Sequence, residues 1–206
     1  MKVRWILLLA GMITIAATAG VPVPKRELRR ILVVPVNLTD TALVQRIVSF
    51  AQANCPAEIA VTDPLPFSGS EAREALASVL KRLRRDGMRD AVTVLLGWPC
   101  DTAWHGFYDP EVEAGVVNLP ALSAGVGGDR EKYCRRIERQ VMRIIGMFLG
   151  LSPCPNPRCV MHPYHTLHEL DDMGRNFCPP CVGRLERAVS SMGYATRNVG
   201  HAVTVP

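Results

Sequence analysis

The sequence predicts an α/β fold with a mostly parallel, twisted sheet and an antiparallel edge strand. Three apolar runs of strand length, Ile31–Val36, Ile59–Val61 and Ala91–Trp98, are separated by two segments with helical periodicity. Two successive strand–helix–strand passages imply parallel strands that are joined by right-handed crossovers. Ala103–Tyr108 and Val112–Leu119, which flank the turn dipeptide Asp109-Pro110, then predict a hairpin at the edge of the sheet.

Local signals support each helix of the first half. Thr39 or Asp40 can cap the first helix, whose apolar face comprises Leu43, Val44, Ile47, Val48 and Ala51. Ser68 and Glu71 form a capping-box pattern before the second helix, which directs inward Ala72, Ala75, Leu76, Val79, Leu80 and Leu83. The run Ala91–Trp98 is apolar throughout, which indicates a strand that is buried on both faces.

Two helices are predicted in the second half. Asp129 can cap a long helix that runs to Leu149, and Gly150 suits the left-handed position that closes a helix. The residues at core spacing in this helix are Tyr133, Ile137, Val141, Ile144, Ile145 and Phe148. The last helix, Pro179–Met192, has an apolar side formed by Val182, Leu185, Ala188, Val189 and Met192.

Four of the seven cysteines form two pairs, Cys154/Cys159 and Cys178/Cys181. Each pair can bind one side of a tetrahedral Zn²⁺, and four thiolates leave no position open for water, so the metal would be structural. Two prolines lie within each pair and lower the entropy cost of ordering the ligands. Disulfides or a redox-active Cys-Pro-Pro-Cys pair are the alternatives in an oxidising compartment. The other three cysteines, predicted to be buried or disulfide-linked, are Cys55, Cys100 and Cys134.

The stretch from Arg143 to Cys181 resembles the signature of the archaemetzincins, a family of zinc metallopeptidases. In that family a helix carries H-E-x-x-H-x-x-G-x-x-H, a cysteine follows at once, and a C-V-M turn and a C-x-x-C complete the pattern. Gly150, the four paired cysteines and the turn Cys159-Val160-Met161 match it. The resemblance implies a zincin-like α+β domain, an apolar floor formed by Met161 beneath the catalytic site, and an edge strand that pairs with extended peptide.

The catalytic positions depart from the family pattern. Arg143, Met147 and Pro153 stand where the three zinc-binding histidines would be, and Ile144 replaces the general-base glutamate. A permanent cation repels Zn²⁺, a thioether is a poor ligand for hydrolytic zinc, and proline offers no side-chain donor atom. The sequence therefore predicts a non-catalytic metallopeptidase homologue with one structural zinc and no catalytic zinc. Its cleft is a candidate site for a peptide or protein partner.

Two enzymatic alternatives stay open. An active zinc metallopeptidase could use relocated ligands from His162, His165 and His168, with His105 or Glu169 as further ligands. A thiol–disulfide protein could instead use the second cysteine pair, Cys178/Cys181.

The first nineteen residues predict an export signal. Two positive charges precede an apolar run, and the small residues Ala17-Thr18-Ala19 suit cleavage. An uncleaved membrane anchor through residues 6–19 is the alternative, and either would put the folded part outside the cytoplasm. Residues 20–30 are then predicted as a linker, 31–193 as the archaemetzincin-like domain and 194–206 as a tail.

The net charge of +5 comes largely from three basic clusters, Lys25–Arg30, Lys81–Arg89 and Arg130–Arg143. These clusters lack the regular alternation with aromatic residues that a stacking platform for nucleic acid needs. We therefore expect solvated helix faces and a basic flank to the N-terminal apolar segment, and no binding of nucleic acid.

Overall fold

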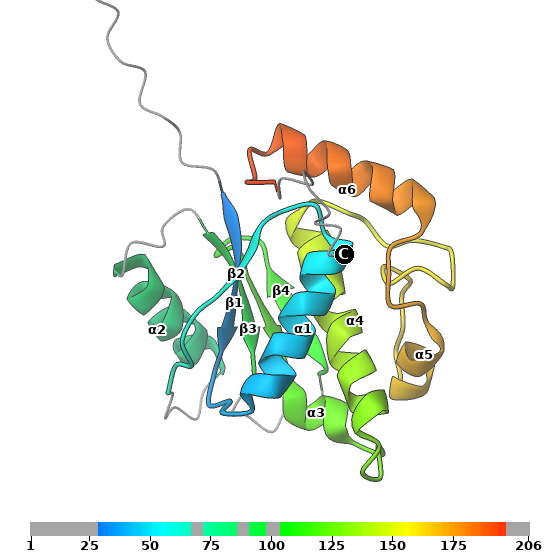
Figure 1. Cartoon of the computed structure of the whole chain (residues 1–206), viewed down its shortest axis with the longest axis horizontal. Coiled ribbons are helices and arrows are strands. Elements are labelled where there is room, and N and C mark those ends of the chain that lie inside the picture. The colour runs from blue at the N-terminus through cyan, green and yellow to red at the C-terminus, as the bar shows by residue number, and fades with distance from the viewer. Residues whose placement is uncertain (1–28, 67–71, 86–90, 98–103, 197–206) are drawn as a thin grey trace, which may run out of the picture.

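A five-stranded sheet forms the centre of the fold (Figure 1). The computed structural model describes residues 29–66, 72–85, 91–97 and 104–196. The strands follow the spatial order β2-β1-β3-β5-β4, and only the β4–β5 pair is antiparallel. Their bounds are Arg30–Pro35 for β1, Ile59–Val61 for β2, Ala91–Leu96 for β3, Gly106–Asp109 for β4 and Ala114–Val117 for β5. The predicted mostly parallel sheet with an antiparallel edge strand is confirmed.

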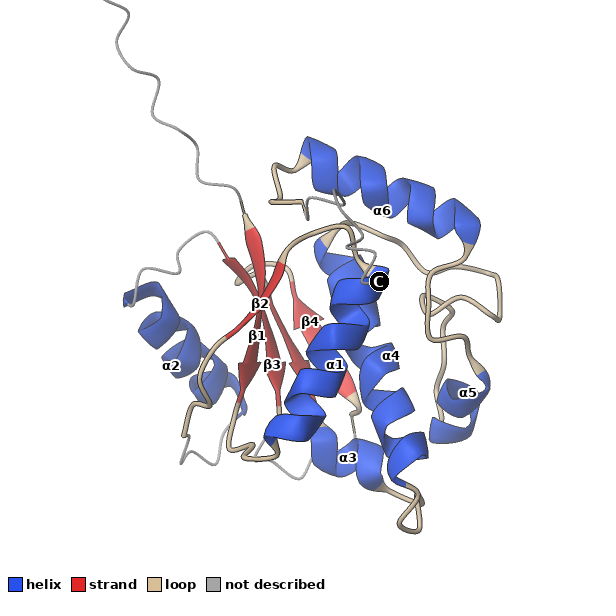
Figure 2. Ribbon diagram, viewed as in Figure 1, coloured by secondary structure: helices blue, strands red, loops and turns tan. Residues whose placement is uncertain are grey.

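Helices cover both faces of this sheet (Figure 2). One face is covered by α2, Ala72–Arg85, whose Val79 and Leu80 pack with one set of alternate strand residues. The other face carries α1, Thr41–Asn54, and α4, Arg130–Phe148, together with three shorter helices. These are α3, Leu119–Ser123, α5, Leu167–Asp172, and α6, Pro179–Ser191.

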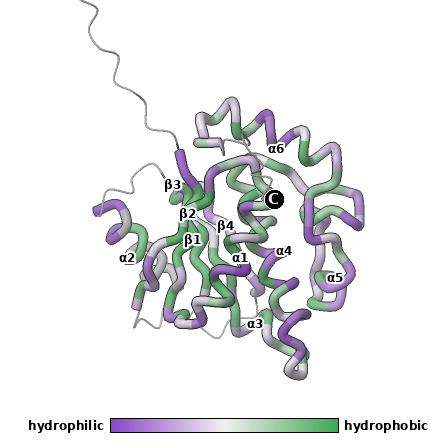
Figure 3. The backbone as a smooth tube through the Cα atoms, viewed as in Figure 1, coloured by the Kyte–Doolittle hydropathy of each residue, from purple (hydrophilic) through white to green (hydrophobic). Residues whose placement is uncertain are grey.

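The division into two cores follows from the alternation of side chains along each strand. In β1, Ile31 and Val33 contribute to the larger core beneath α1 and α4, whereas Leu32 and Val34 contribute to the smaller core beneath α2. The inner strands are accordingly hydrophobic over most of their length (Figure 3). This explains why the inner strands read as continuous apolar runs in the sequence.

The caps of α4 agree with the sequence prediction. The Asp129 side chain accepts a hydrogen bond from the backbone N–H of Lys132 at 2.8 Å. At the other end, Gly150 has φ = +72°, which an L side chain rarely adopts. The helix therefore begins and ends where local chemistry dictates, and it delivers residues 143 and 147 to the same side of the domain.

Residues on either side of the predicted 31–193 domain pack against it. Tyr194 is 3% exposed, and the backbone N–H of Ala195 donates to the carbonyl of Arg29 at 2.9 Å. Residues 29–30 and 194–196 therefore contribute contacts beside the predicted range. No periodic pattern marks the C-terminal extension, because the buried tyrosine stands alone beyond a glycine turn.

The basic cluster of α4 is also more buried than a solvated helix face. Arg136 is 3% exposed and forms a bidentate ion pair with Asp171, both N–O distances being 2.7 Å. Glu138 is 2% exposed and accepts hydrogen bonds from Arg46 and Arg175. The prediction of a solvated helix face is therefore wrong for Arg136 and Glu138. Partners from α1, α5 and the loop after α5 neutralise their charges inside the fold.

Several sequence-based predictions lie outside the described residues. They include the export signal or anchor at 1–19, most of the linker, the Ser68/Glu71 capping box, Cys100 and the tail beyond 196. Within the described ranges, no helix has both the length and the apolar character that crossing a bilayer requires.

Candidate metal centre and adjoining cleft

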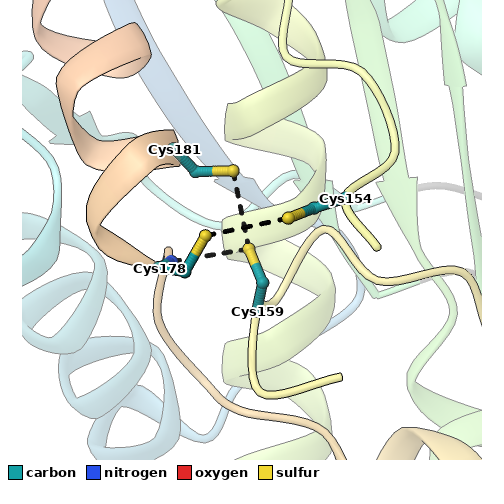
Figure 4. A group of neighbouring side chains, drawn as sticks. All are labelled: Cys154, Cys159, Cys178 and Cys181. Carbon is teal, nitrogen blue, oxygen red and sulfur yellow. Dashed lines mark hydrogen bonds between the residues drawn. The ribbon is translucent and has the colours of Figure 1, made fainter. Parts of the chain in front are cut away.

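Four cysteine side chains converge between the end of α4 and the start of α6 (Figure 4). Cys154 and Cys159 lie on the loop after α4, Cys178 is the N-cap of α6, and Cys181 lies in its first turn. All four are buried, and their sulfur atoms lie within 4.8 Å of one another. The structure thus brings together the four residues that the sequence singled out as metal ligands.

The sulfur spacing suits a tetrahedral zinc ion. With Zn–S bonds of about 2.3 Å, a regular tetrahedron separates its sulfur atoms by about 3.8 Å. The Sγ–Sγ distances are 3.7 Å for Cys154–Cys178 and 3.7 Å for Cys159–Cys181. Both contacts join the two halves of the motif, as a single ion bound by four thiolates requires.

Neighbouring hydrogen-bond donors offset part of the cost of ionising two of these buried thiols. Burial opposes ionisation of Cys178, but hydrogen bonds from Cys181 and the other two thiols lower the pKa of Cys178 to about 7. Burial raises the pKa of Cys181 to about 12, and Arg184, whose Nη2 lies 3.1 Å from its Sγ, acts in the opposite direction. The cysteines at the N-terminus of α6 also face the positive end of the helix dipole.

The turn that contains Met161 connects this metal centre to α4. The backbone N–H of Cys154 donates to the carbonyl of Met161 at 3.0 Å. The Met161 side chain is 1% exposed and packs so closely on α4 that a Cβ added to Gly146 would lie 2.6 Å from its Sδ. Met161 therefore lies in an apolar position against the helix, between the two turn residues whose carbonyls Arg143 contacts.

Arg143 extends from α4 to the same turn. Its Nη1 donates hydrogen bonds to the carbonyls of Val160 and His162 at 2.7 and 2.6 Å. Its guanidinium carbon lies 5.0 Å from the centre of the Tyr164 ring, within the range of a cation–π contact. Burial lowers the pKa of this guanidinium, yet an arginine keeps its charge in proteins.

The other three residues predicted to replace catalytic groups have apolar or solvent-exposed surroundings. Ile144 is 2% exposed and contacts Gly115 of β5, and Met147 packs against the larger core. Pro153 is exposed on the loop after α4. Arg143, Ile144 and Met147, but not Pro153, line a cleft of about 380 Å³.

We refer to this cavity as the cleft. It is lined by residues of α4, by β4 together with the two residues before it, and by Tyr164 and His165. The complete lining is Trp104, His105, Gly106, Phe107, Tyr108, Gln140, Arg143, Ile144, Met147, Tyr164 and His165. Gln140 and Tyr164 were not predicted from the sequence, because an isolated amide or phenol carries no pattern that marks it as part of a site.

The three histidines that were considered as relocated zinc ligands have different surroundings. The Nδ1 of His162 lies 3.0 Å from the carbonyl oxygen of Cys154, His165 lines the cleft, and His168 lies 3.0 Å from Asp172 with its side chain 88% exposed. Among the described residues, only the cysteine quartet brings three or more possible ligand atoms together.

The two further candidate ligands already have partners. Glu169 accepts backbone hydrogen bonds from His165 and Thr166 and completes the capping box of α5. His105 stacks on Tyr164 with their ring centres 5.7 Å apart. Burial lowers the pKa of His105, and the positive charge of Arg136 acts in the same direction.

The sheet order, the Met161 turn and the cysteine cluster define an α/β protein of the zinc-peptidase type. Residues 66–187 match the model of Peptidase family M54, and the chain belongs to this family. This confirms the resemblance to the archaemetzincins that the cysteine spacing and the C-V-M turn had indicated.

Relatives and solved structures support this assignment. An archaemetzincin from Pyrococcus horikoshii is 33% identical over 85 residues, which cover 40% of this chain and 45% of that protein. The matched part thus spans less than half the length of that relative.

The fold is shared with the crystal structure of a zinc-dependent peptidase from Methanocorpusculum labreanum. The TM-score is 0.63 at 19% identity, and the match covers 75% of this chain and 99% of the other. An archaemetzincin structure from Methanopyrus kandleri gives a TM-score of 0.54 at 20% identity, over 82% and 99% of the two chains.

Proposed function

We propose that this protein is an exported, non-catalytic member of its family that binds one structural Zn²⁺ and holds peptide in the cleft. The zinc would be bound by Cys154, Cys159, Cys178 and Cys181, and its role would be to fix the loop after α4 against α6. Because four thiolates complete a tetrahedral shell, this ion would have no position for water or substrate.

The observation that carries the proposed loss of catalysis is the environment of Arg143. Its guanidinium is tied to the carbonyls of Val160 and His162, at the helix position that holds the first zinc-binding histidine of the family motif. A second divalent cation beside it would meet a fixed positive charge in a partly buried site, where Coulomb repulsion is weakly screened. Ile144 and Met147 provide neither a general base nor a good ligand for hydrolytic zinc.

Peptide binding is supported by the geometry of the remaining cleft. It lies beside β4, which is one of the two outermost strands of the described sheet. An outermost strand offers unpaired backbone groups to an extended chain, and such pairing supplies affinity without catalysis. Export is supported by the first nineteen residues, through their charges, apolar run and cleavage-type ending.

Metal stoichiometry combined with a peptidase assay tests the proposal. We expect one zinc per chain by elemental analysis, no zinc in Cys178→Ser, and no cleavage of a broad peptide library by the wild type. Cys134→Ala is the matched control, because Cys134 is equally buried but lies outside the quartet; this variant should keep its zinc. Peptide cleavage that a chelator abolishes would contradict the proposal.

The competing functions predict different results in the same experiments. An enzyme with relocated histidine ligands should contain two zinc ions, one of which is lost in His165→Ala. A thiol–disulfide enzyme should reduce insulin in the presence of a thiol donor and lose this activity in Cys178→Ser. Export is tested by determining the N-terminal residue and the cell fraction of the protein in its native host.

A further inference from the structure

Arg143 is a cation without a carboxylate partner among the described residues. The two hydrogen bonds that hold it are both made by Nη1, so no described residue accepts a hydrogen bond from Nε or Nη2. No aspartate or glutamate side chain lines the cleft within the described chain. A partly buried guanidinium that makes no ion pair is a costly arrangement, and an anionic ligand would stabilise it.

The groups around Arg143 are mainly hydrogen-bond donors. The Tyr164 hydroxyl accepts a hydrogen bond from the side-chain amide of Gln140, which leaves its own O–H to donate. Burial raises the pKa of Tyr164, so the hydroxyl keeps its proton at neutral pH. The neutral ring of His105, stacked on Tyr164, can supply a further N–H. A fixed fork of guanidinium donors with a hydroxyl beside it matches the two oxygens of a carboxylate.

The position of this cation relative to β4 indicates which carboxylate fits. Arg143 contacts Tyr164, and Tyr164 stacks on His105, which immediately precedes the first residue of β4. The cation therefore lies toward the N-terminal end of that strand. A peptide that pairs with β4 in the antiparallel direction, the slightly more stable mode of pairing, ends its own chain at this place.

We propose that Arg143 binds the C-terminal carboxylate of a peptide that pairs antiparallel with the free edge of β4. The inference rests on the proposed peptide-binding function and adds the chemical group that the cleft selects. The short length of β4, four residues, suits a chain terminus better than a long internal segment. In this arrangement the substitution that removes a zinc ligand also creates a carboxylate receptor.

Titration of the zinc-loaded chain with three matched peptides tests the proposal. The probes are N-acetyl-tetraalanine as the free acid, the same peptide as the C-terminal amide, and N-acetyl-Ala-Glu-Ala-Ala-amide, which carries its carboxylate on a side chain. We expect the free acid to bind at least tenfold more tightly than either amide, since a bidentate charged hydrogen bond is lost in both. In NMR spectra, the Nε–H resonance of Arg143 should shift with the free acid.

Variants then assign the preference to one side chain. Arg143→Met should bind acid and amide equally, and Arg143→Lys should keep only part of the preference, because an ammonium lacks the planar fork. Arg187→Met is the control, since Arg187 is an exposed arginine on α6 outside the cleft; it should retain the full preference. The comparison of peptides on the unaltered chain stands even if an Arg143 variant does not fold.

The outcomes separate this inference from the function on which it rests. Equal binding of acid and amide would overturn the inference and leave peptide binding intact, and tight binding of the glutamate peptide would overturn its assignment to a chain terminus. Failure of all three peptides to bind at millimolar concentration would overturn both peptide binding and the inference. Cleavage of a probe would count against the non-catalytic role alone.

Discussion

The contact between Met161 and Gly146 can be tested by adding a single methyl group to α4. In Gly146→Ala the new Cβ would lie 2.6 Å from Met161 Sδ and 3.0 Å from Phe177 Cε1. Both neighbours are buried, at 1% and 7% exposure. The methyl group therefore requires the buried side chains of Met161 and Phe177 to move.

The expected effect is the difference between two opposing contributions. Replacing glycine by alanine inside a helix stabilises it by about 1 kcal/mol. Overpacking a tight core costs about 1–3 kcal/mol, and the flexible methionine keeps this cost near the middle of the range. We expect Gly146→Ala to lower the free energy of unfolding by about 1 kcal/mol.

Gly183→Ala is the matched control, because a methyl group added to this α6 glycine would have only the Arg187 side chain near it, at 3.6 Å. It should raise the free energy of unfolding by about 0.5–1 kcal/mol, measured by urea denaturation with zinc present. In a Met161→Ala background, Gly146→Ala should become stabilising, since the obstructing sulfur is gone. If Gly146→Ala alone stabilised the protein as much as Gly183→Ala, the close packing of Met161 on α4 would be refuted.

Three further predictions concern the charged network and the metal. Asp171→Asn should lower the free energy of unfolding by about 3 kcal/mol at pH 7, because it leaves the buried Arg136 without its counter-charge. Burial opposes ionisation of Asp171, but hydrogen bonds from Arg136 and Lys132 lower its pKa. Its stabilising effect is therefore complete above the ordinary value of 3.8 and is lost as pH falls through the lower folded value, so the two proteins should converge in acid denaturation experiments. Removing zinc with a chelator should lower the free energy of unfolding by about 4 kcal/mol, relative to protein in free zinc at about a thousand times the Kd. An unchanged melting curve would refute a structural metal. His168→Ala should change neither zinc content nor stability by more than about 0.5 kcal/mol, since this side chain is 88% exposed; loss of metal would support the relocated-ligand alternative.

Hydrophobic periodicity and capping residues predicted those strands and helix ends that are determined by residues close together in the sequence. The strand Ile59–Val61 and the caps at Asp40 and Asp129 are found where the pattern indicated them. The short helices α3 and α5 were not predicted as such. Each has only five or six residues, too few for an apolar stripe to establish a period.

The buried charges of α4 illustrate what periodicity cannot reveal. Arg136 and Glu138 lie within the cluster that looks like a solvated face, yet their partners come from positions 35 and 37 residues later in the chain, and for Glu138 also from Arg46. A charged side chain is buried only when distant partners meet it with the correct geometry. The pairing therefore becomes visible only after the chain has folded.

The metal centre could be predicted from local sequence, whereas the contacts in the cleft could not. Spacing alone predicted the cysteine quartet as ligands, because two short-range pairs each restrict the geometry of half a tetrahedron, and the structure brings the two halves together. The sequence also predicted that Arg143 replaces a zinc-binding histidine of the family motif. Only the tertiary structure decided what this arginine does instead, because its contacts with the carbonyls of Val160 and His162 and with Tyr164 join segments that local sequence does not connect.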